Sequence, residues 1–168
     1  MKTVLYAQPY DISAEGFAFA TAQDYRTKAA ALVNRFGQKV EEFEIQFIDG
    51  ERIDAALADS VGLHQGDVGA FFEAVEHWDE HQKRAAIIAA GECGYDVGWD
   101  SDPDDLDLDI YEMESLRDLA DHFIEEGLFG EIPERLRFYI DFDAIARDLG
   151  CDYAETEIAG TRFVYRCG

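Results

Sequence analysis

The sequence predicts an α+β fold, arranged as an elongated chain of three small domains. Segments with the two-residue period of strands and segments with the 3.6-residue period of helices occur in the same chain. Three glycines and one proline between Gly91 and Pro103 interrupt both patterns and indicate a boundary between lobes. The net charge of -23 over 168 residues favours an extended arrangement, because a compact body would hold these like charges close together.

The first expected domain, residues 1–52, is a small α+β unit. Phe43, Ile45 and Phe47 alternate with Glu and Gln, which predicts a half-buried strand. Thr21 is suited to cap the N-terminus of a helix, and Gly37 is suited to end it. The expected elements are strands at 3–6, 16–19 and 40–48 and a helix at 22–36.

The second expected domain, residues 53–97, is helical, because it shows no strand pattern. Phe71, Phe72, Val75 and Trp78 recur at helical spacing. They predict one long helix over residues 67–90, preceded by a short helix at 53–57.

The third expected domain, residues 98–168, is an acidic α+β unit. Leu106, Leu108 and Ile110 alternate with aspartates, which predicts a strand with one continuous carboxylate face. Gly127 ends the next helix, and Ala159-Gly160 suits the turn of a closing hairpin. The expected elements after the first strand are helices at 114–126, from 133 onward and up to 149, and strands at 153–158 and 161–166.

The negative charge is concentrated in the last third of the chain. Residues 1–95 carry a net charge of -8, residues 96–157 carry -17 and residues 158–168 carry +2. A net charge of magnitude about 2–8 is enough to keep a small domain soluble. The additional negative charge of this chain therefore indicates a functional role beyond solubility. Binding to nucleic-acid phosphates is excluded, because that binding depends on Lys and Arg. At about 1.7 Å of helix axis per phosphate charge, 23 charges match about 39 Å of duplex DNA.

The chain start has no targeting signal, and no stretch of 18 apolar residues occurs. We therefore expect a cytoplasmic protein that does not contact a membrane.

One motif resembles an enzyme site. His77, Glu80 and His81 fit the pattern H-x-x-E-H, which on one helix places two imidazoles a turn apart beside a carboxylate. A zinc-dependent hydrolase using these three residues is an alternative interpretation, although zinc needs a further ligand. The charged residues around the motif favour a solvated helix face. We therefore expect no catalytic residue, no metal and no cofactor, and hence no enzyme.

Residues 115–149 resemble the C-terminal signature of the ArdA antirestriction family. They contain an acidic helix ending in EEG, then the segment GEIP, then YIDFDAIARDL, at the spacing of that family. Residues 41–51, EEFEIQFIDGE, resemble the acidic strand near the end of the family's first domain.

The resemblance implies an antirestriction protein, encoded on a mobile element, that forms a homodimer through its third domain. It implies a DNA mimic that competitively occupies the DNA-binding channel of type I restriction-modification enzymes. The carboxylates expected to face that channel are Glu41, Glu42, Glu44, Asp104, Asp105, Asp107, Asp109, Glu112, Glu114, Asp118, Asp121, Glu125, Glu126, Glu131 and Glu134. An acidic regulatory module that binds another basic protein remains the second interpretation.

Overall fold

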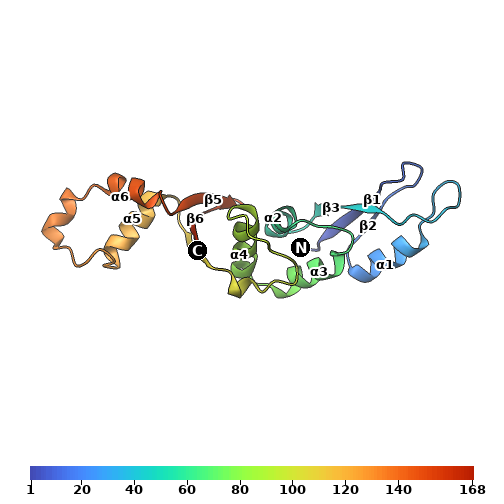
Figure 1. Ribbon diagram of the computed structural model, residues 1–168, viewed down its shortest axis with the longest axis horizontal. Helices are drawn as coiled ribbons and strands as arrows, with labels where there is room; N and C mark the ends of the chain where they lie inside the picture. The colour runs from blue at the N-terminus through green and yellow to red at the C-terminus, as the bar shows by residue number, and fades with distance from the viewer. The chain divides into compact units, whose positions relative to one another are not determined.

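The computed structural model describes residues 1–168 and divides the chain into two compact units, Met1–Leu106 and Asp107–Gly168. Each unit contains one three-stranded antiparallel sheet together with helices (Figure 1). The predicted α+β class is therefore confirmed. The division into three domains, 1–52, 53–97 and 98–168, stays a prediction.

The sheet of the first unit has its strands in the order β2-β1-β3. These strands are β1 (Val4–Pro9), β2 (Phe17–Phe19) and β3 (Phe43–Asp49). Leu5 pairs with Phe19 in β2, and Ala7 pairs with Ile45 in β3. All four side chains are buried. Since directly paired residues point to the same side of a sheet, these residues form its core-facing side.

Two helices pack against this sheet, α1 (Ala22–Ala31) and α3 (Val68–His77). Figure 1 shows both helices on the same side of the sheet. Phe71 of α3 is fully buried and meets the ring of Phe47 nearly edge to face. Thr21 caps α1 as predicted, since its Oγ1 accepts a hydrogen bond from the backbone N of Asp24 at 3.0 Å. The helix ends at Ala31 and not at residue 36, because residues 32–40 form a closed loop.

The other two helices of the first unit, α2 (Arg52–Val61) and α4 (Glu80–Gly91), pack against each other. Ala58 of α2 belongs to the same hydrophobic cluster as the sheet residues.

The prediction of a single long helix over 67–90 is wrong. Trp78 and Asp79 are not helical and separate α3 from α4. Asp79 starts a new helix with a capping box, in which its side chain and that of Gln82 each accept the other residue's backbone N–H.

The sheet of the second unit has its strands in the order β4-β6-β5. These strands are β4 (Leu108–Glu112), β5 (Ala154–Ile158) and β6 (Thr161–Cys167). The predicted closing hairpin is confirmed as β5 and β6. Its turn residues Ala159 and Gly160 have φ of 53° and 90°. Positive φ at both positions is typical of the tight turns that match the twist of a hairpin.

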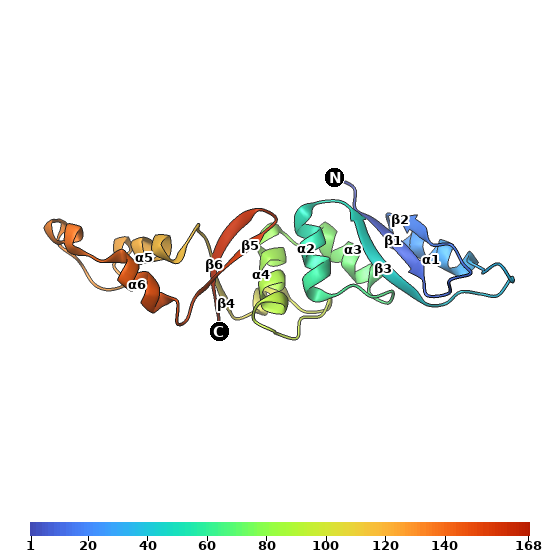
Figure 2. The same cartoon turned by 90° about the horizontal axis from the view of Figure 1, so that it is seen from above.

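Helices α5 (Leu116–Glu125) and α6 (Phe142–Leu149) pack against each other (Figure 2). Leu119 and Phe123 of α5 form the second unit's core with Val164 of β6. The segment between the two helices forms a wide loop, drawn in orange in Figure 1.

Two expectations for the acidic part need correction. The strand expected from the alternation of Leu106, Leu108 and Ile110 with aspartates begins only at Leu108, since Asp105 ends a 3-10 turn, η1 (Pro103–Asp105). Asp109 is therefore the only one of these aspartates within the strand, and the expected continuous carboxylate face does not form there. The turn is capped by Asp102, whose Oδ1 accepts from the backbone N of Asp104 at 3.0 Å. The helix expected after Pro133 is also a 3-10 segment, η2 (Glu134–Tyr139). None of the helices has the length and apolar character needed to span a bilayer.

Candidate protein-binding surface

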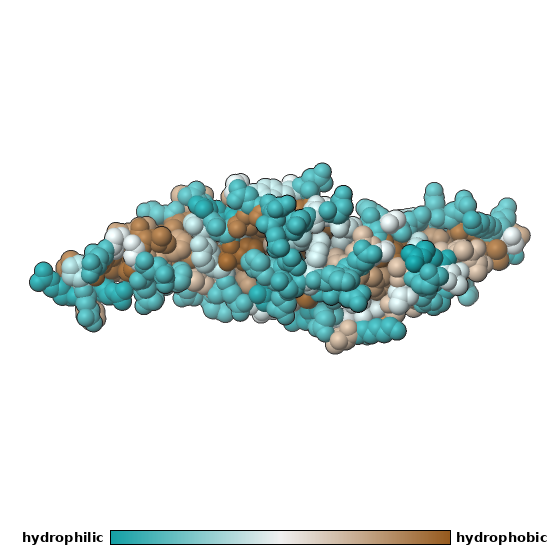
Figure 3. Space-filling model, turned by 90° about the horizontal axis from the view of Figure 1, so that it is seen from below, coloured by the Kyte–Doolittle hydropathy of each residue, from teal (hydrophilic) through white to brown (hydrophobic).

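Fourteen of the fifteen predicted carboxylates are exposed, and Asp109 is half-buried. The exposed residues of the first unit are Glu41, Glu42, Glu44, Asp104 and Asp105. Those of the second unit are Asp107, Glu112, Glu114, Asp118, Asp121, Glu125, Glu126, Glu131 and Glu134. Figure 3 shows hydrophilic side chains, in teal, over much of one face of both units. The side chains are therefore accessible to a partner.

Helix α5 carries the most regular group of these acids. Asp118, Asp121 and Glu125 follow one another at intervals of three and four residues, which places them on one side of the helix. The other side of α5 is buried through residues such as Leu119 and Phe123. The three carboxylates extend over about 10 Å of helix axis. The same length of duplex carries about six phosphate charges, so α5 alone would be too sparse to imitate DNA.

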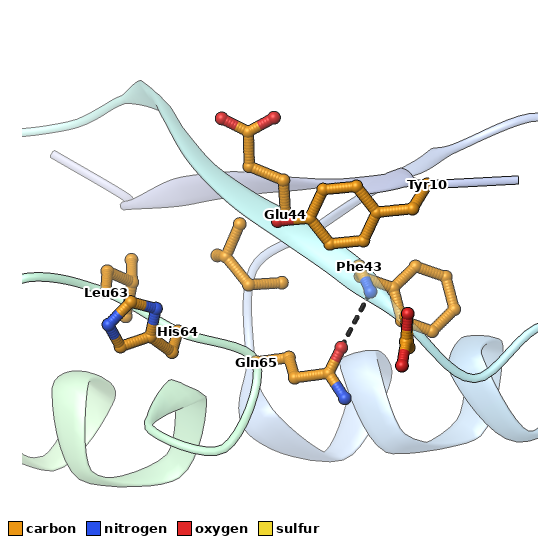
Figure 4. Close-up of a pocket in the computed structure, with 8 residues that line it drawn as sticks. Tyr10, Phe43, Glu44, Leu63, His64 and Gln65 are labelled. Carbon is orange, nitrogen blue, oxygen red and sulfur yellow. Dashed lines mark hydrogen bonds between the residues drawn. The ribbon is translucent and has the colours of Figure 1, made fainter. Parts of the chain in front are cut away.

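Three acids of the first unit lie at or just before the start of β3, the strand at the edge of its sheet: Glu41, Glu42 and Glu44. Glu42 and Glu44 line a pocket together with Tyr10, His64 and Gln65 (Figure 4). Gln65 fixes the backbone at this edge: its Oε1 accepts from the N of Phe43 at 2.6 Å, and its Nε2 donates to the O of Glu41 at 3.1 Å. In Figure 4 the Glu44 carboxylate extends away from Gln65. The side chain of Gln65 thereby holds the strand that carries these two acids.

Some of these carboxylates already have a basic partner within their unit. Glu41 lies 3.5 Å from Lys39, and Glu125 lies 4.0 Å from Arg137. Asp109 is opposite Arg166 in the ladder of β4 and β6 and accepts from its Nε at 2.9 Å. This hydrogen bond raises the pKa of the Arg166 guanidinium. Exposed pairs of this kind contribute only about 0–1 kcal/mol, so Glu41 and Glu125 can exchange their partners at little cost.

The residues of the H-x-x-E-H motif do not share one helix. His77 is the last residue of α3, whereas Glu80 and His81 begin α4. The Nδ1 of His77 lies 2.9 Å from the carbonyl O of Glu73, and Glu80 pairs with Arg84. The alternative interpretation required two imidazoles one turn apart on one helix, and the structure does not have this arrangement. The structure contains no group of three or more His, Cys, Asp or Glu placed to hold a metal ion.

Sequence reasoning treated the carboxylates as surface groups and missed one that is buried. Asp54 is 2% exposed, and its Oδ1 lies 2.6 Å from the Nζ of Lys83 in the interior of the first unit. A signal was present in the sequence: Asp54 precedes the buried Leu57 and Ala58 by three and four residues, on the apolar side of α2.

The segment between α5 and α6 exposes large apolar side chains. Phe138 is 93% exposed and Tyr139 is 84% exposed. Leu128, Phe129 and Leu136 are exposed as well. An ordered segment with this many exposed apolar residues is typical of a protein interface.

The sequence of the chain matches the model of a known protein family. Residues 22–161 match the family model described as "Antirestriction protein (ArdA)". The matched residues include most of both units. No curated protein matches the chain.

Proposed function

The chain belongs to the ArdA family of antirestriction proteins, and on that premise we propose that it inhibits restriction by mimicking DNA. Its exposed carboxylates take the place of phosphates in the DNA-binding channel of a type I restriction-modification enzyme. The observation that carries this proposal is the exposure of fourteen predicted carboxylates, distributed over both units of a chain with a net charge of -23.

The physical basis is charge complementarity. A DNA channel is lined by Lys and Arg, and carboxylates held on a folded surface attract these residues as phosphates do. The complementary charge accelerates association and makes binding weaker as salt rises. Because each exposed pair contributes at most about 1 kcal/mol, affinity depends on many carboxylates together. The inhibitor needs no catalytic residue, cofactor or metal for this mechanism.

A homodimer would double the length of the mimic. The apolar residues between α5 and α6, including Phe138 and Tyr139, are the part of the second unit that we assign to the dimer contact. Burial of Phe138 and Tyr139 would remove large aromatic surfaces from water, which is the main driving force of protein association. Two chains carry twice the charge of -23, enough to match about 78 Å of duplex.

The proposal is tested by adding the purified protein to a type I restriction-modification enzyme and measuring DNA methylation and cleavage. We expect inhibition at about one dimer per enzyme, and a rising inhibitory concentration as salt is increased. An enzyme that keeps full activity at large excess of the protein, across several type I families, would contradict the proposal. It would favour the second interpretation, an acidic module for another basic partner.

A further inference from the structure

Two loops at one end of the first unit expose apolar side chains. They are residues 10–16, between β1 and β2, and residues 32–40, between α1 and β3; we call them together the loop tip. Figures 1 and 2 both show these loops, blue and cyan, next to each other at the right-hand end of the drawing. Ile12 is 98% exposed and Phe36 is 69% exposed, and Tyr10 and Val33 are exposed as well. Sequence reasoning did not single out this surface.

The loop tip is ordered by the side chain of Asn34, which is buried. Its Nδ2 donates to Asp11 Oδ2 at 2.8 Å and to Gln38 Oε1 at 3.1 Å. Its Oδ1 accepts from the backbone N of Phe36 and of Gln38, both at 2.9 Å. The backbone N of Arg35 donates to the O of Ser13 at 3.0 Å and joins the two loops directly. The loops are therefore ordered before a partner binds, so binding loses little conformational entropy in them.

Single exposed apolar residues are common on protein surfaces. The loop tip differs, because its apolar residues stand on two loops that are hydrogen-bonded to each other. The buried side chain of Asn34, with its four hydrogen bonds, holds the loops in place. Such a preorganised apolar surface is typical of a recognition site.

The charge of the loop tip differs from that of the rest of the chain. Residues 10–16 and 32–40 contain two basic and two acidic residues and are therefore neutral, whereas the whole chain has a net charge of -23. The guanidinium Cζ of Arg35 lies 5.0 Å from the centroid of the Phe36 ring. The Lys and Arg residues of a DNA channel would repel Arg35, so Arg35 favours a partner surface that carries a carboxylate opposite it.

The loop tip is continuous with the acidic strand β3. The backbone N of Tyr10 donates to the O of Glu42 at 3.2 Å, and Tyr10 lines the pocket that contains Glu42 and Glu44 (Figure 4). Lys39 of the loop tip pairs with Glu41. A protein that binds the carboxylates of β3 therefore also comes within reach of Tyr10 and of the apolar side chains next to it.

From these observations we infer that the loop tip docks on an apolar patch of the restriction-modification enzyme at the border of its DNA channel. Ile12 and Phe36 enter the patch, and Arg35 pairs with a carboxylate there. This inference rests on the proposed function and adds to it a contact that DNA does not make. Since apolar burial is not screened by ions, the contact retains its strength at salt concentrations that weaken the carboxylate contacts.

The test compares the double variant Ile12→Ser/Phe36→Ser with the wild-type chain and with the matched control Ile48→Ser. Ile48 is an exposed apolar residue of β3 outside the loop tip. Affinity for the enzyme is measured at low and at high salt. We expect the double variant to bind about tenfold or more weakly than wild type at both salt concentrations, with an unchanged dependence on salt. The control should bind like wild type.

Each other outcome has a defined meaning. A double variant that binds like wild type overturns the inference and leaves the proposed function intact. A wild-type chain that does not bind the enzyme at all overturns the proposed function itself. If the double variant changes the association state of the free protein in sedimentation experiments, a second copy covers the loop tip, and the inference is again overturned. Thermal unfolding should be nearly unchanged, because both side chains are exposed in the free protein.

Discussion

Lys83 of α4 and Asp54 of α2 form an ion pair inside the first unit, with the Nζ of Lys83 2.6 Å from the Oδ1 of Asp54. Both side chains are buried, and Lys83 also donates to the carbonyl O of Val75 at 3.1 Å. The pair therefore joins α2, α3 and α4. Unlike the exposed carboxylates that we assign to target binding, Asp54 is buried and acts within the fold.

Removing one partner of this pair should strongly destabilise the first unit. Lys83→Met leaves the Asp54 carboxylate buried without its cation, which costs about 3–5 kcal/mol. Urea unfolding measures the loss. The matched control is Arg117→Met, which breaks the exposed pair with Asp143 and should cost about 0–1 kcal/mol. The double variant Asp54→Leu/Lys83→Met should cost less than Lys83→Met alone; an equal or larger loss would show that the charges themselves stabilise the fold.

Neutralising the acids of α5 should weaken inhibition more than removing the same charge elsewhere. In the triple variant Asp118→Asn/Asp121→Asn/Glu125→Gln, three carboxylates on one helix side are lost. The control variant Asp59→Asn/Glu73→Gln/Glu76→Gln removes three exposed carboxylates that we do not assign to the target. We expect about a threefold to a hundredfold loss of inhibition for the α5 variant, from about 0.2–1 kcal/mol per exposed pair. Equal losses in both variants would indicate an effect of net charge alone.

The dimer assignment predicts a change of mass in solution. Phe138→Ser/Tyr139→Ser removes two largely exposed aromatic side chains from the segment between α5 and α6. Sedimentation equilibrium should show a dimer for wild type and a monomer for this variant, while the circular dichroism spectrum stays unchanged. A dimeric variant would place the contact on another surface.

Acid should loosen the loop tip through Asp11. Hydrogen bonds from the Ser13 side chain, from Asn34 and from the Ser13 backbone N–H lower the pKa of the Asp11 carboxyl below its ordinary value of 3.8. The resulting stabilisation is complete above this ordinary value and is lost as the pH falls through the lowered pKa of the folded state.

The variant Asp11→Asn isolates this effect. Wild type should unfold at higher urea concentration than Asp11→Asn at neutral pH, and the difference should shrink at about pH 3. A difference of the same size at both pH values would assign the contribution of Asp11 to something other than its charge.

Most elements of the fold follow from local patterns in the sequence. Alternating apolar residues predict β3, Thr21 predicts the start of α1, and Ala159-Gly160 predicts the hairpin of β5 and β6. The predicted helix boundaries are wrong where the hydrogen bonds of a polar side chain end a helix or start a new one. The capping box of Asp79 splits a helix whose apolar spacing continues across the break, and Asn34 closes a loop where helical spacing continues to Phe36.

The sequence predicts the exposure of the carboxylates in the candidate surface, but not the side-chain pairs that form between distant residues. Exposure of carboxylates follows from composition, because most charged side chains stay in water. The burial of Asp54 depends on Lys83, which lies far away in the sequence, and the order of the loop tip depends on a contact between Asp11 and Asn34. The local spacing of Asp54 to Leu57 and Ala58 indicates which side of α2 it is on, but neither long-range partner can be read from local sequence.

The central claim is that this chain and DNA compete for one site. The most direct test measures the affinity of the chain for a type I restriction-modification enzyme at increasing concentrations of a short target duplex. Competition predicts that the apparent Kd rises linearly with the free duplex concentration, from its value without duplex, and that no complex contains all three components. A ternary complex, or a Kd that does not depend on the duplex, would contradict DNA mimicry.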